Sequence, residues 1–267
     1  MNKKIFVIAA AALLGVSVSC NRAKKADKMA ETLTFQSAKF DTIVNLVKDD
    51  ANSPKSTINI DLIYATGPNA SQINEEILKS GILPAEDLKR GEKKTVPRAL
   101  EIFVKNYVKG YKEDCLKAYK EDPEGVYEYE FKVTSQISYG RDSVINYRAT
   151  QEAYSGGAHG NTATFVMNFD KNTGHIITKN DIFKDGTDEK LLEIIVDKVC
   201  KHFNATDLDD LAEKEGVFEM DDPFIPTLFT LGTDEITFIY LEGEVGPYSA
   251  SEIRAVIPFS EIKDLMK

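Results

Sequence analysis

The stretch Tyr154–Gly160, with the sequence YSGGAHG, lies between the two longest β-patterned regions of the chain. It places three glycines, a tyrosine and one of the three histidines side by side. A glycine-rich stretch of this kind predicts a turn between strands, because glycine readily adopts the positive φ angles that tight turns require. The strands on either side of this loop therefore define the sheet around which we expect the chain to fold.

Alternating apolar and polar residues predict the strands that flank this loop. Before it, residues 127–137 and 145–153 alternate with a period of two, and Gly140-Arg141-Asp142 predicts a hairpin turn between them. After it, residues 163–169 alternate in the same way. This arrangement predicts consecutive antiparallel strands joined by short turns.

Similar patterns predict the remaining elements. A helix is expected from Val96, with Thr95 as N-cap, and another after Thr187, with its buried face formed by Leu192 and later residues. The acidic segment 207–222 is expected to be mobile. Further elements are a strand at 58–64, a short helix at 73–78, a loop at 84–94, a hairpin at 228–240, a strand at 253–257 and a helix at 262–266. Runs of hairpins with few helices predict an α+β fold with antiparallel sheets, packed helices and two closely associated subdomains.

The N-terminus has the pattern of a bacterial lipoprotein signal. Lys3 and Lys4 precede an apolar run that is too short to span a bilayer comfortably, and small residues then lead to Cys20. We expect a signal peptide at residues 1–19, lipid attachment at Cys20 and a lipidated tether at residues 20–32. An ordinary cleaved signal peptide and an uncleaved anchor are the alternatives. The rest divides into an N-terminal module, 33–153, and a C-terminal module, 154–267.

The overall charge restricts the partners that the protein would bind. The net charge is −10, which argues against a nucleic-acid partner, because proteins that bind phosphate backbones need a basic face. An acidic surface suits a basic partner, and it equally suits plain solubility.

The remaining cysteines do not form a disulfide framework. Cys115 and Cys200 each lie on or beside an apolar helical stripe, where a free cysteine behaves as a small hydrophobic residue. We favour two buried thiols, and a disulfide between them stays open.

No catalytic or metal-binding motif is present in the sequence. His159, His175 and His202 lie too far apart for a typical zinc site, and neither a phosphate-binding loop nor a nucleophile elbow occurs. Acidic pairs such as Glu242 and Glu244 are compatible with a glycan hydrolase, although a solvated loop is the simpler interpretation. We therefore expect no enzyme activity, no cofactor and no metal.

The glycine-rich loop has two interpretations. In the structural one, Gly156 and Gly157 form a turn and His159 is a buried, hydrogen-bonded core residue. In the functional one, the bare backbone approaches a ligand or partner, with Tyr154 as an aromatic anchor and His159 as a hydrogen-bonding group.

The loop also carries a family resemblance. Together with Asn168-Phe-Asp170, Thr173-Gly174, Asp181-Ile-Phe183, Gly246-Pro-Tyr248 and Ile257-Pro-Phe-Ser260, it resembles a bacterial extracytoplasmic domain family found in the ectodomains of RsiV-type anti-sigma factors. A related N-terminal module, also attached to PdaC-type peptidoglycan deacetylases, would cover about residues 35–153. The RsiV-type ectodomain binds lysozyme, so the resemblance implies a binding module, with Tyr248 as a further contact residue. Neither a sigma-factor-binding segment nor a deacetylase domain is found in this sequence, so those activities do not carry over.

These observations together predict a non-catalytic lipoprotein of the cell envelope. It would bind a protein, such as lysozyme, or a cell-wall ligand, such as a peptidoglycan fragment, through Tyr154, Gly156, Gly157, His159 and Tyr248. A glycan hydrolase and a purely structural envelope protein are the alternatives. Asn21, rather than aspartate, follows the lipidated cysteine, which favours the outer membrane.

Overall fold

A computed structural model describes residues 7–8, 32–84, 95–220 and 222–267 of the chain. Contacts divide the chain into two compact units: residues 1–135 with 150–163, and residues 136–149 with 164–267. Strands β4 (Tyr129–Tyr139), β5 (Val144–Tyr154) and β6 (Asn161–Asp170) contribute residues to both units. The predicted module boundary between residues 153 and 154 stays a prediction.

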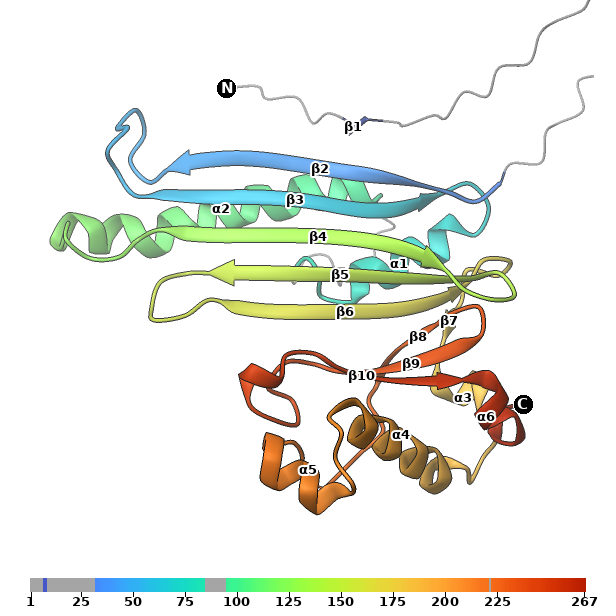
Figure 1. The fold of residues 1–267 in the computed structure, drawn as a ribbon. Coiled ribbons are helices and arrows are strands. Elements are labelled where there is room, and N and C mark those ends of the chain that lie inside the picture. Colours follow the sequence, from blue (N-terminus) through green and yellow to red (C-terminus); the bar gives the residue numbers. More distant parts are fainter. Residues whose placement is uncertain (1–6, 9–31, 85–94, 221) are drawn as a thin grey trace, which may run out of the picture. The chain divides into compact units, whose positions relative to one another are not determined.

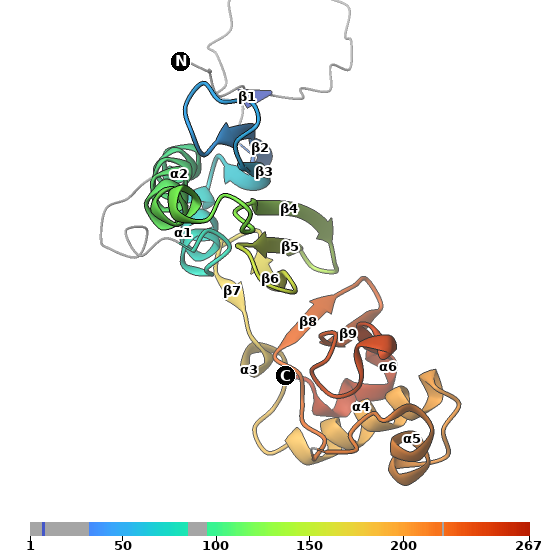
Figure 2. The ribbon, with the colours of Figure 1, turned by 90° about the vertical axis from the view of Figure 1, so that its left-hand side faces the viewer.

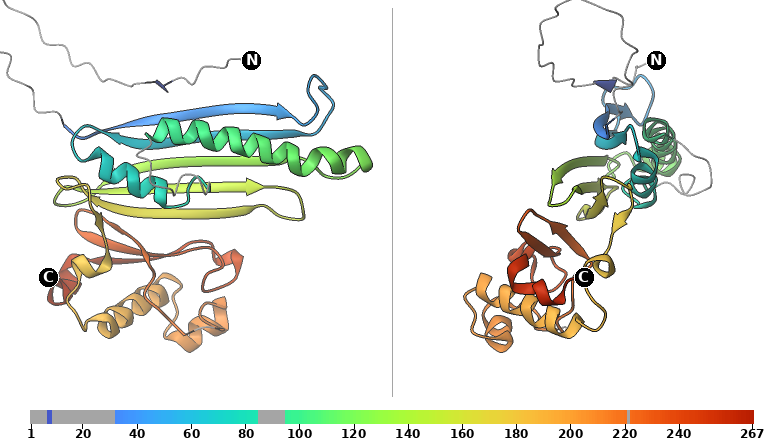
Figure 3. Two further views of the ribbon diagram at one scale, coloured as in Figure 1. Left: turned by 180° about the vertical axis from the view of Figure 1, so that it is seen from behind. Right: turned by 90° about the vertical axis from the view of Figure 1, so that its right-hand side faces the viewer.

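The first unit is a layer of strands with helices on one face (Figure 1). β2 (Thr34–Asn45) and β3 (Lys55–Thr66) pair antiparallel along their whole length, whereas β3 and β4 pair in parallel from Ser56 and Tyr129 onward. A parallel pair needs a crossover connection. That crossover contains α1 (Ala70–Lys79) and α2 (Val96–Glu121), and Figures 2 and 3 show both helices on the same face of the strands.

The core of the first unit lies between this face and the two helices. Period-two alternation in β3 buries one side of the strand and leaves the other side accessible, as the sequence predicts. Phe103 of α2 packs against Phe131 of β4 with ring centroids 4.7 Å apart, and Tyr111 packs against Tyr129 at 5.0 Å. The other buried residues include Ile58, Ile60, Leu62, Tyr64, Ile73, Ile77, Leu100 and Val104.

At the outer side of β2, the two residues of β1 (Val7–Ile8) pair antiparallel with Ala38 and Ser37. The rest of the predicted signal peptide and Cys20 lie outside the described residues. Within the described part of the chain, no helix combines the length and the apolar character that crossing a bilayer requires.

The second unit contains a three-stranded antiparallel sheet in the order β10-β9-β8, covered by α4. Phe238 and Tyr240 of β9 and Leu191, Ile195 and Val199 of α4 are fully buried in its core. Its elements are β7 (Ile176–Ile177), α3 (Lys179–Ile182), α4 (Asp188–His202), α5 (Leu208–Glu215), β8 (Leu228–Leu231), β9 (Glu235–Tyr240), η2 (Tyr248–Ala250), β10 (Ile253–Pro258), α6 (Phe259–Ile262) and η3 (Lys263–Leu265). The whole of the large sheet follows chain order from β1 to β7.

A buried asparagine of β5 forms hydrogen bonds to β8 inside the second unit. The side-chain amide of Asn146 donates to the Leu231 carbonyl at 2.9 Å, and the Leu231 N–H donates to Asn146 Oδ1 at 2.9 Å. The Asn146 side chain therefore pairs with the Leu231 backbone as a neighbouring strand would. Both the N–H and the carbonyl of this buried β8 residue are hydrogen-bonded as a result. Asn168 of β6 also donates to β8, to the Phe229 carbonyl at 2.9 Å.

The predicted α+β class, with antiparallel sheets and packed helices, is confirmed, but two local expectations are wrong and one helix was not predicted. The acidic segment 207–222 contains α5, which is capped by Asp207 and ended by Gly216 at φ 65°. Only Leu211 of α5 is buried, which explains the missing apolar periodicity. In α4, Leu191 rather than Leu192 is fully buried, and the C-terminal helix is split into α6 and η3. Apart from Pro84, the loop expected at 84–94 lies outside the described residues.

Candidate functional site

The glycine-rich stretch is the loop that joins β5 to β6. Gly156 and Gly157 have φ angles of 89° and 92°, in the region that glycine tolerates best. A Cβ atom on Gly157 would meet nothing within 4 Å, so backbone conformation rather than lack of space requires glycine there. The Tyr154 hydroxyl donates to the Gly157 carbonyl at 3.0 Å and ties the loop to the end of β5.

His159 is exposed in this loop. The interpretation of His159 as a buried core residue is therefore wrong, because its imidazole faces solvent instead of packing in the interior. The turn interpretation of Gly156 and Gly157 is correct, and it leaves the side chains of the loop accessible.

A hollow of about 480 Å³ lies beside the loop, on the helix-free face of the first unit. Tyr154 and Gly160 form part of its wall, and the strands β3 to β6 form its floor. The floor is mainly polar, with hydroxyl, amide, carboxylate and ammonium groups. The lining residues are Thr57, Asn59, Glu130, Phe131, Lys132, Glu152, Ala153, Tyr154, Gly160, Asn161 and Thr162.

Polar contacts across the strands fix several of these side chains. Lys132 of β4 forms an ion pair with Glu152 of β5 at 2.8 Å, and both side chains are about half exposed. Asn59 of β3, in the amide orientation that satisfies both of its ends, donates to Asp41 of β2 at 2.9 Å. The hollow therefore presents groups that are held in place before any ligand arrives.

A second contact along the same face joins β2 to β3. The Lys39 ammonium lies 2.7 Å from the Asp61 carboxylate, which also accepts a hydrogen bond from Ser37. Burial by itself would raise the pKa of Asp61, but the hydrogen bonds from Lys39 and Ser37 outweigh it and hold that pKa below its ordinary value. Asp61 therefore stays ionised and keeps Lys39 neutralised.

Tyr248, the remaining predicted contact residue, belongs to the second unit. This residue is 77% exposed on the short helix η2. A Cβ atom on Gly243, which has a φ of 74°, would lie 3.3 Å from the Tyr248 ring, so the ring lies directly over that glycine. The predicted residues thus fall into two groups. Tyr154 at the end of β5 and Gly156, Gly157 and His159 in the loop after it belong to the first unit, and Tyr248 belongs to the second.

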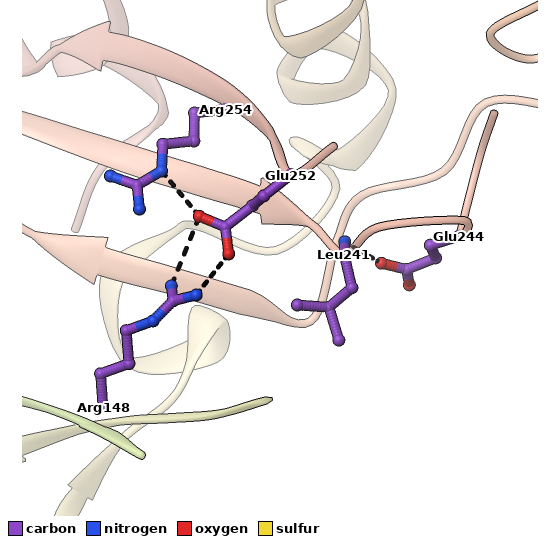
Figure 4. A network of polar contacts seen from close by, with 5 residues as sticks. All are labelled: Arg148, Leu241, Glu244, Glu252 and Arg254. Carbon is purple, nitrogen blue, oxygen red and sulfur yellow. Dashed lines mark hydrogen bonds and ion pairs between the residues drawn. The ribbon is translucent and has the colours of Figure 1, made fainter. Parts of the chain in front are cut away.

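Tyr248 lies on a segment between two carboxylates, Glu244 and Glu252, and each of them is held by polar contacts (Figure 4). Glu244 accepts a hydrogen bond from the Leu241 N–H at 2.7 Å, and Glu252 binds Arg148 at 2.5 Å and Arg254 at 2.7 Å. Burial by itself would raise the pKa of Glu252, but the hydrogen bonds from Arg148 and Arg254 outweigh it and lower that pKa. An aromatic side chain is thus presented on a segment fixed at both ends.

Neither cysteine that the structure describes is placed for nucleophilic chemistry. Cys115 and Cys200 are both free and buried, and burial raises the pKa of each thiol. The question of a disulfide between them is thereby answered in favour of two separate buried thiols. In the described ranges, no group of three or more histidine, cysteine, aspartate or glutamate side chains is arranged to hold a metal ion.

Sequence reasoning missed most of the residues that line the hollow. Glu130 and Lys132 are visible in the sequence as the polar side of an alternating strand, but the parallel pairing of β3 with β4 is what sets them beside Thr57 and Asn59. That pairing joins strands separated by two helices, so local pattern gives no signal for it.

Comparisons with known proteins agree on the fold. No curated protein matches the chain. A crystal structure of a DUF3298 family member from Bacteroides fragilis NCTC 9343 covers 89% of this chain and 95% of its own, with 21% identity and a TM-score of 0.79. A DUF3298 family protein from Pseudomonas aeruginosa PAO1 covers 89% of this chain and 96% of its own, with 14% identity and a TM-score of 0.59. Residues 180–260, which lie in the second unit, match the model of DUF3298, a family described as proteins of unknown function.

Proposed function

We propose that the protein is a non-catalytic lipoprotein of the cell envelope, anchored through Cys20, that acts as a binding module. Its ligand would be a protein, such as lysozyme, or a cell-wall ligand, such as a peptidoglycan fragment. The outer membrane is the favoured location, because Asn21 rather than aspartate follows Cys20. The observation that carries the proposal is the 480 Å³ hollow beside the exposed glycine-rich loop.

The loop suits recognition better than catalysis. Tyr154 is held by its hydrogen bond to Gly157, so its ring meets a ligand without a large loss of side-chain entropy. Gly156 and Gly157 expose backbone that a ligand can approach closely, and the exposed His159 adds a polar contact. These features support a surface that binds without breaking covalent bonds.

Tyr248 supports a second contact surface in the second unit. Exposed tyrosines on fixed segments are frequent anchors in protein interfaces, because they bury a large area at low entropic cost. Acidic residues are frequent in the adjoining segments, including Glu219, Glu242 and Glu244. A basic protein surface is therefore the favoured partner for this part of the chain.

One observation favours an alternative. Glu130 and Glu152 line the same hollow, and glycan hydrolases use two carboxylates on either side of the bond that they cleave. Glycan hydrolysis is therefore the competing hypothesis for the hollow.

Calorimetry distinguishes these hypotheses. The purified chain is titrated with lysozyme and, separately, with soluble peptidoglycan fragments, and the products are analysed after incubation. We expect saturable binding of at least one ligand, weaker binding by His159→Ala or Tyr248→Ala, and no change in the glycan. Absence of binding to both ligands would overturn the proposal, and glycan cleavage that Glu130→Gln or Glu152→Gln abolishes would replace it with hydrolysis.

A further inference from the structure

The helix-free face of the first unit carries a row of polar side chains that runs across its strands. Asp41 of β2 lies opposite Asn59 of β3, and Asn59 lies beside Lys132 of β4 in the parallel register. Lys132 in turn contacts Glu152 of β5. We call these four residues the polar row.

From the polar row and the hollow that it crosses, we propose that this face binds a linear, uncharged glycan laid across the strands. This inference rests on the proposed function, and it names the class of cell-wall ligand and the surface that holds it. Neighbouring strands lie about 4.8 Å apart, so the row from β2 to β5 extends for roughly 14 Å. A surface of that length accommodates several sugar rings in succession.

The chemistry of the row matches sugar hydroxyl and amide groups. Carboxylate oxygens accept hydrogen bonds from hydroxyls, whereas the Asn59 amide and the Lys132 ammonium donate them. Thr57 and Thr162, which also line the hollow, supply hydroxyls that do both. Hydrogen bonding of this mixed kind suits a sugar, because each sugar hydroxyl can both donate and accept.

An apolar side chain stands next to this polar surface. Ile43 pairs with Thr57 across β2 and β3, and the residue is 61% exposed. Paired residues of antiparallel strands share a face, so Ile43 lies on the same side as the hollow. It offers an apolar contact for the C–H face of a sugar ring, beside hydrogen-bonding groups for the ring edges.

Charge disfavours a polyanionic chain at the same place. Asp41, Asp61, Glu130 and Glu152 set four carboxylates on this face against the two ammonium groups of Lys39 and Lys132. A phosphate-rich polymer would meet net repulsion there, since polyanion binding requires clustered cations. An uncharged chain avoids this penalty.

The position of the row also disfavours an extended peptide. Peptides that add to sheets bind along an edge, where unpaired backbone groups are free. Asn59 belongs to β3, which is hydrogen-bonded to β2 on one side and to β4 on the other. Along the polar row, β3 therefore offers side chains rather than a free backbone edge.

The test is a titration of the full chain with a linear oligomer of N-acetylglucosamine and, separately, with polyphosphate. The variant Lys132→Met/Glu152→Gln removes both charges of the central pair, and Asn59→Ala removes the neighbouring amide. Lys109→Met/Glu113→Gln is the matched control, since it removes an exposed ion pair of α2 at 3.5 Å. Exposed pairs of this kind contribute roughly 0–1 kcal/mol to stability, so each variant is expected to fold.

We expect the oligomer to bind and polyphosphate not to bind. The Kd for the oligomer should rise about tenfold or more in both variants of the polar row and stay within about twofold in the control. Oligomer binding that the polar-row variants leave unchanged would overturn this inference and leave the proposed envelope function standing. If lysozyme binds and the oligomer does not, the glycan inference is likewise overturned and the proposed function stands. If the oligomer, lysozyme and peptidoglycan fragments all fail to bind, the glycan inference and the proposed function are both overturned.

Discussion

Arg148 and Glu252 are 104 positions apart in the sequence and meet in a two-pronged ion pair inside the second unit. The Arg148 terminal nitrogens lie 2.5 and 3.4 Å from the two Glu252 oxygens, and both side chains are about 80% buried. Glu252 precedes β10 and follows the segment that carries Tyr248. The pair therefore fixes the end of that segment to β5 (Figure 4).

Replacing Arg148 by Met should destabilise the second unit by about 1–3 kcal/mol. The substitution leaves the largely buried Glu252 carboxylate with Arg254 as its remaining charged partner in Figure 4. Denaturant unfolding measures the change. Lys109→Met on the exposed pair of α2 is the control and should change the free energy of unfolding by less than about 1 kcal/mol. An Arg148→Met variant as stable as the unmodified chain would contradict the role given to this pair.

The contribution of Glu252 should depend on pH in a defined direction. Its pKa is lower in the folded protein than its ordinary value of 4.5, so the folded state binds protons less readily than the unfolded state. The stability that the ionised carboxylate supplies is therefore fully present above pH 4.5 and is lost as the pH falls through the folded-state pKa. Comparing unfolding of the unmodified chain and Glu252→Gln from pH 7 downward should show a difference that shrinks below pH 4.5. A difference that grows on acidification would refute this assignment.

Asn146→Ala should be more damaging than Asn168→Ala. The first change leaves the Leu231 N–H and carbonyl without their side-chain partner, whereas the second removes a single hydrogen bond to Phe229. Each buried backbone group left unpaired costs about 1–3 kcal/mol, so the two variants should differ by at least about 1 kcal/mol. Both asparagines are buried, which makes the comparison a matched one. Equal losses of unfolding free energy in the two variants would contradict the larger stabilising contribution assigned to Asn146.

Alanine substitution should destabilise the protein more at Gly140, where a Cβ atom has no room, than at Gly157, where only the positive φ angle opposes it. A Cβ atom on Gly140 would lie 1.9 Å from the Leu231 carbonyl oxygen, so Gly140→Ala forces backbone movement and should cost about 3 kcal/mol or more. Gly157→Ala meets no atom and should cost only about 1–2 kcal/mol, from the positive φ angle. Thermal unfolding of the two variants tests the ranking, and a larger loss for Gly157→Ala would reverse it.

The residue patterns within single segments predicted most of the helices and strands. The features that they did not predict depend on pairing between strands far apart in the sequence. The alternation in β3 and β4 and the start of α2 after Thr95 are local signals, and the structure follows them. In β5 the first four residues, Val144–Tyr147, are all buried, so the predicted alternation does not hold there. The partner of β3 is not local, because β4 reaches it only after the crossover through α1 and α2. For the same reason the glycine-rich loop was identified from sequence, whereas the polar row beside it was not. The short helix α5 escaped prediction because a single buried leucine gives no periodicity.

Hydrogen exchange of the full chain, measured with and without soluble peptidoglycan fragments, shows whether the hollow and the loop beside it bind a ligand. We expect slower amide exchange on ligand addition in the loop 154–160 and in the segments around Asn59 and Lys132, with little change along α2. Unchanged exchange in that loop and those strands, at ligand concentrations that saturate any calorimetric signal, would contradict the proposed binding.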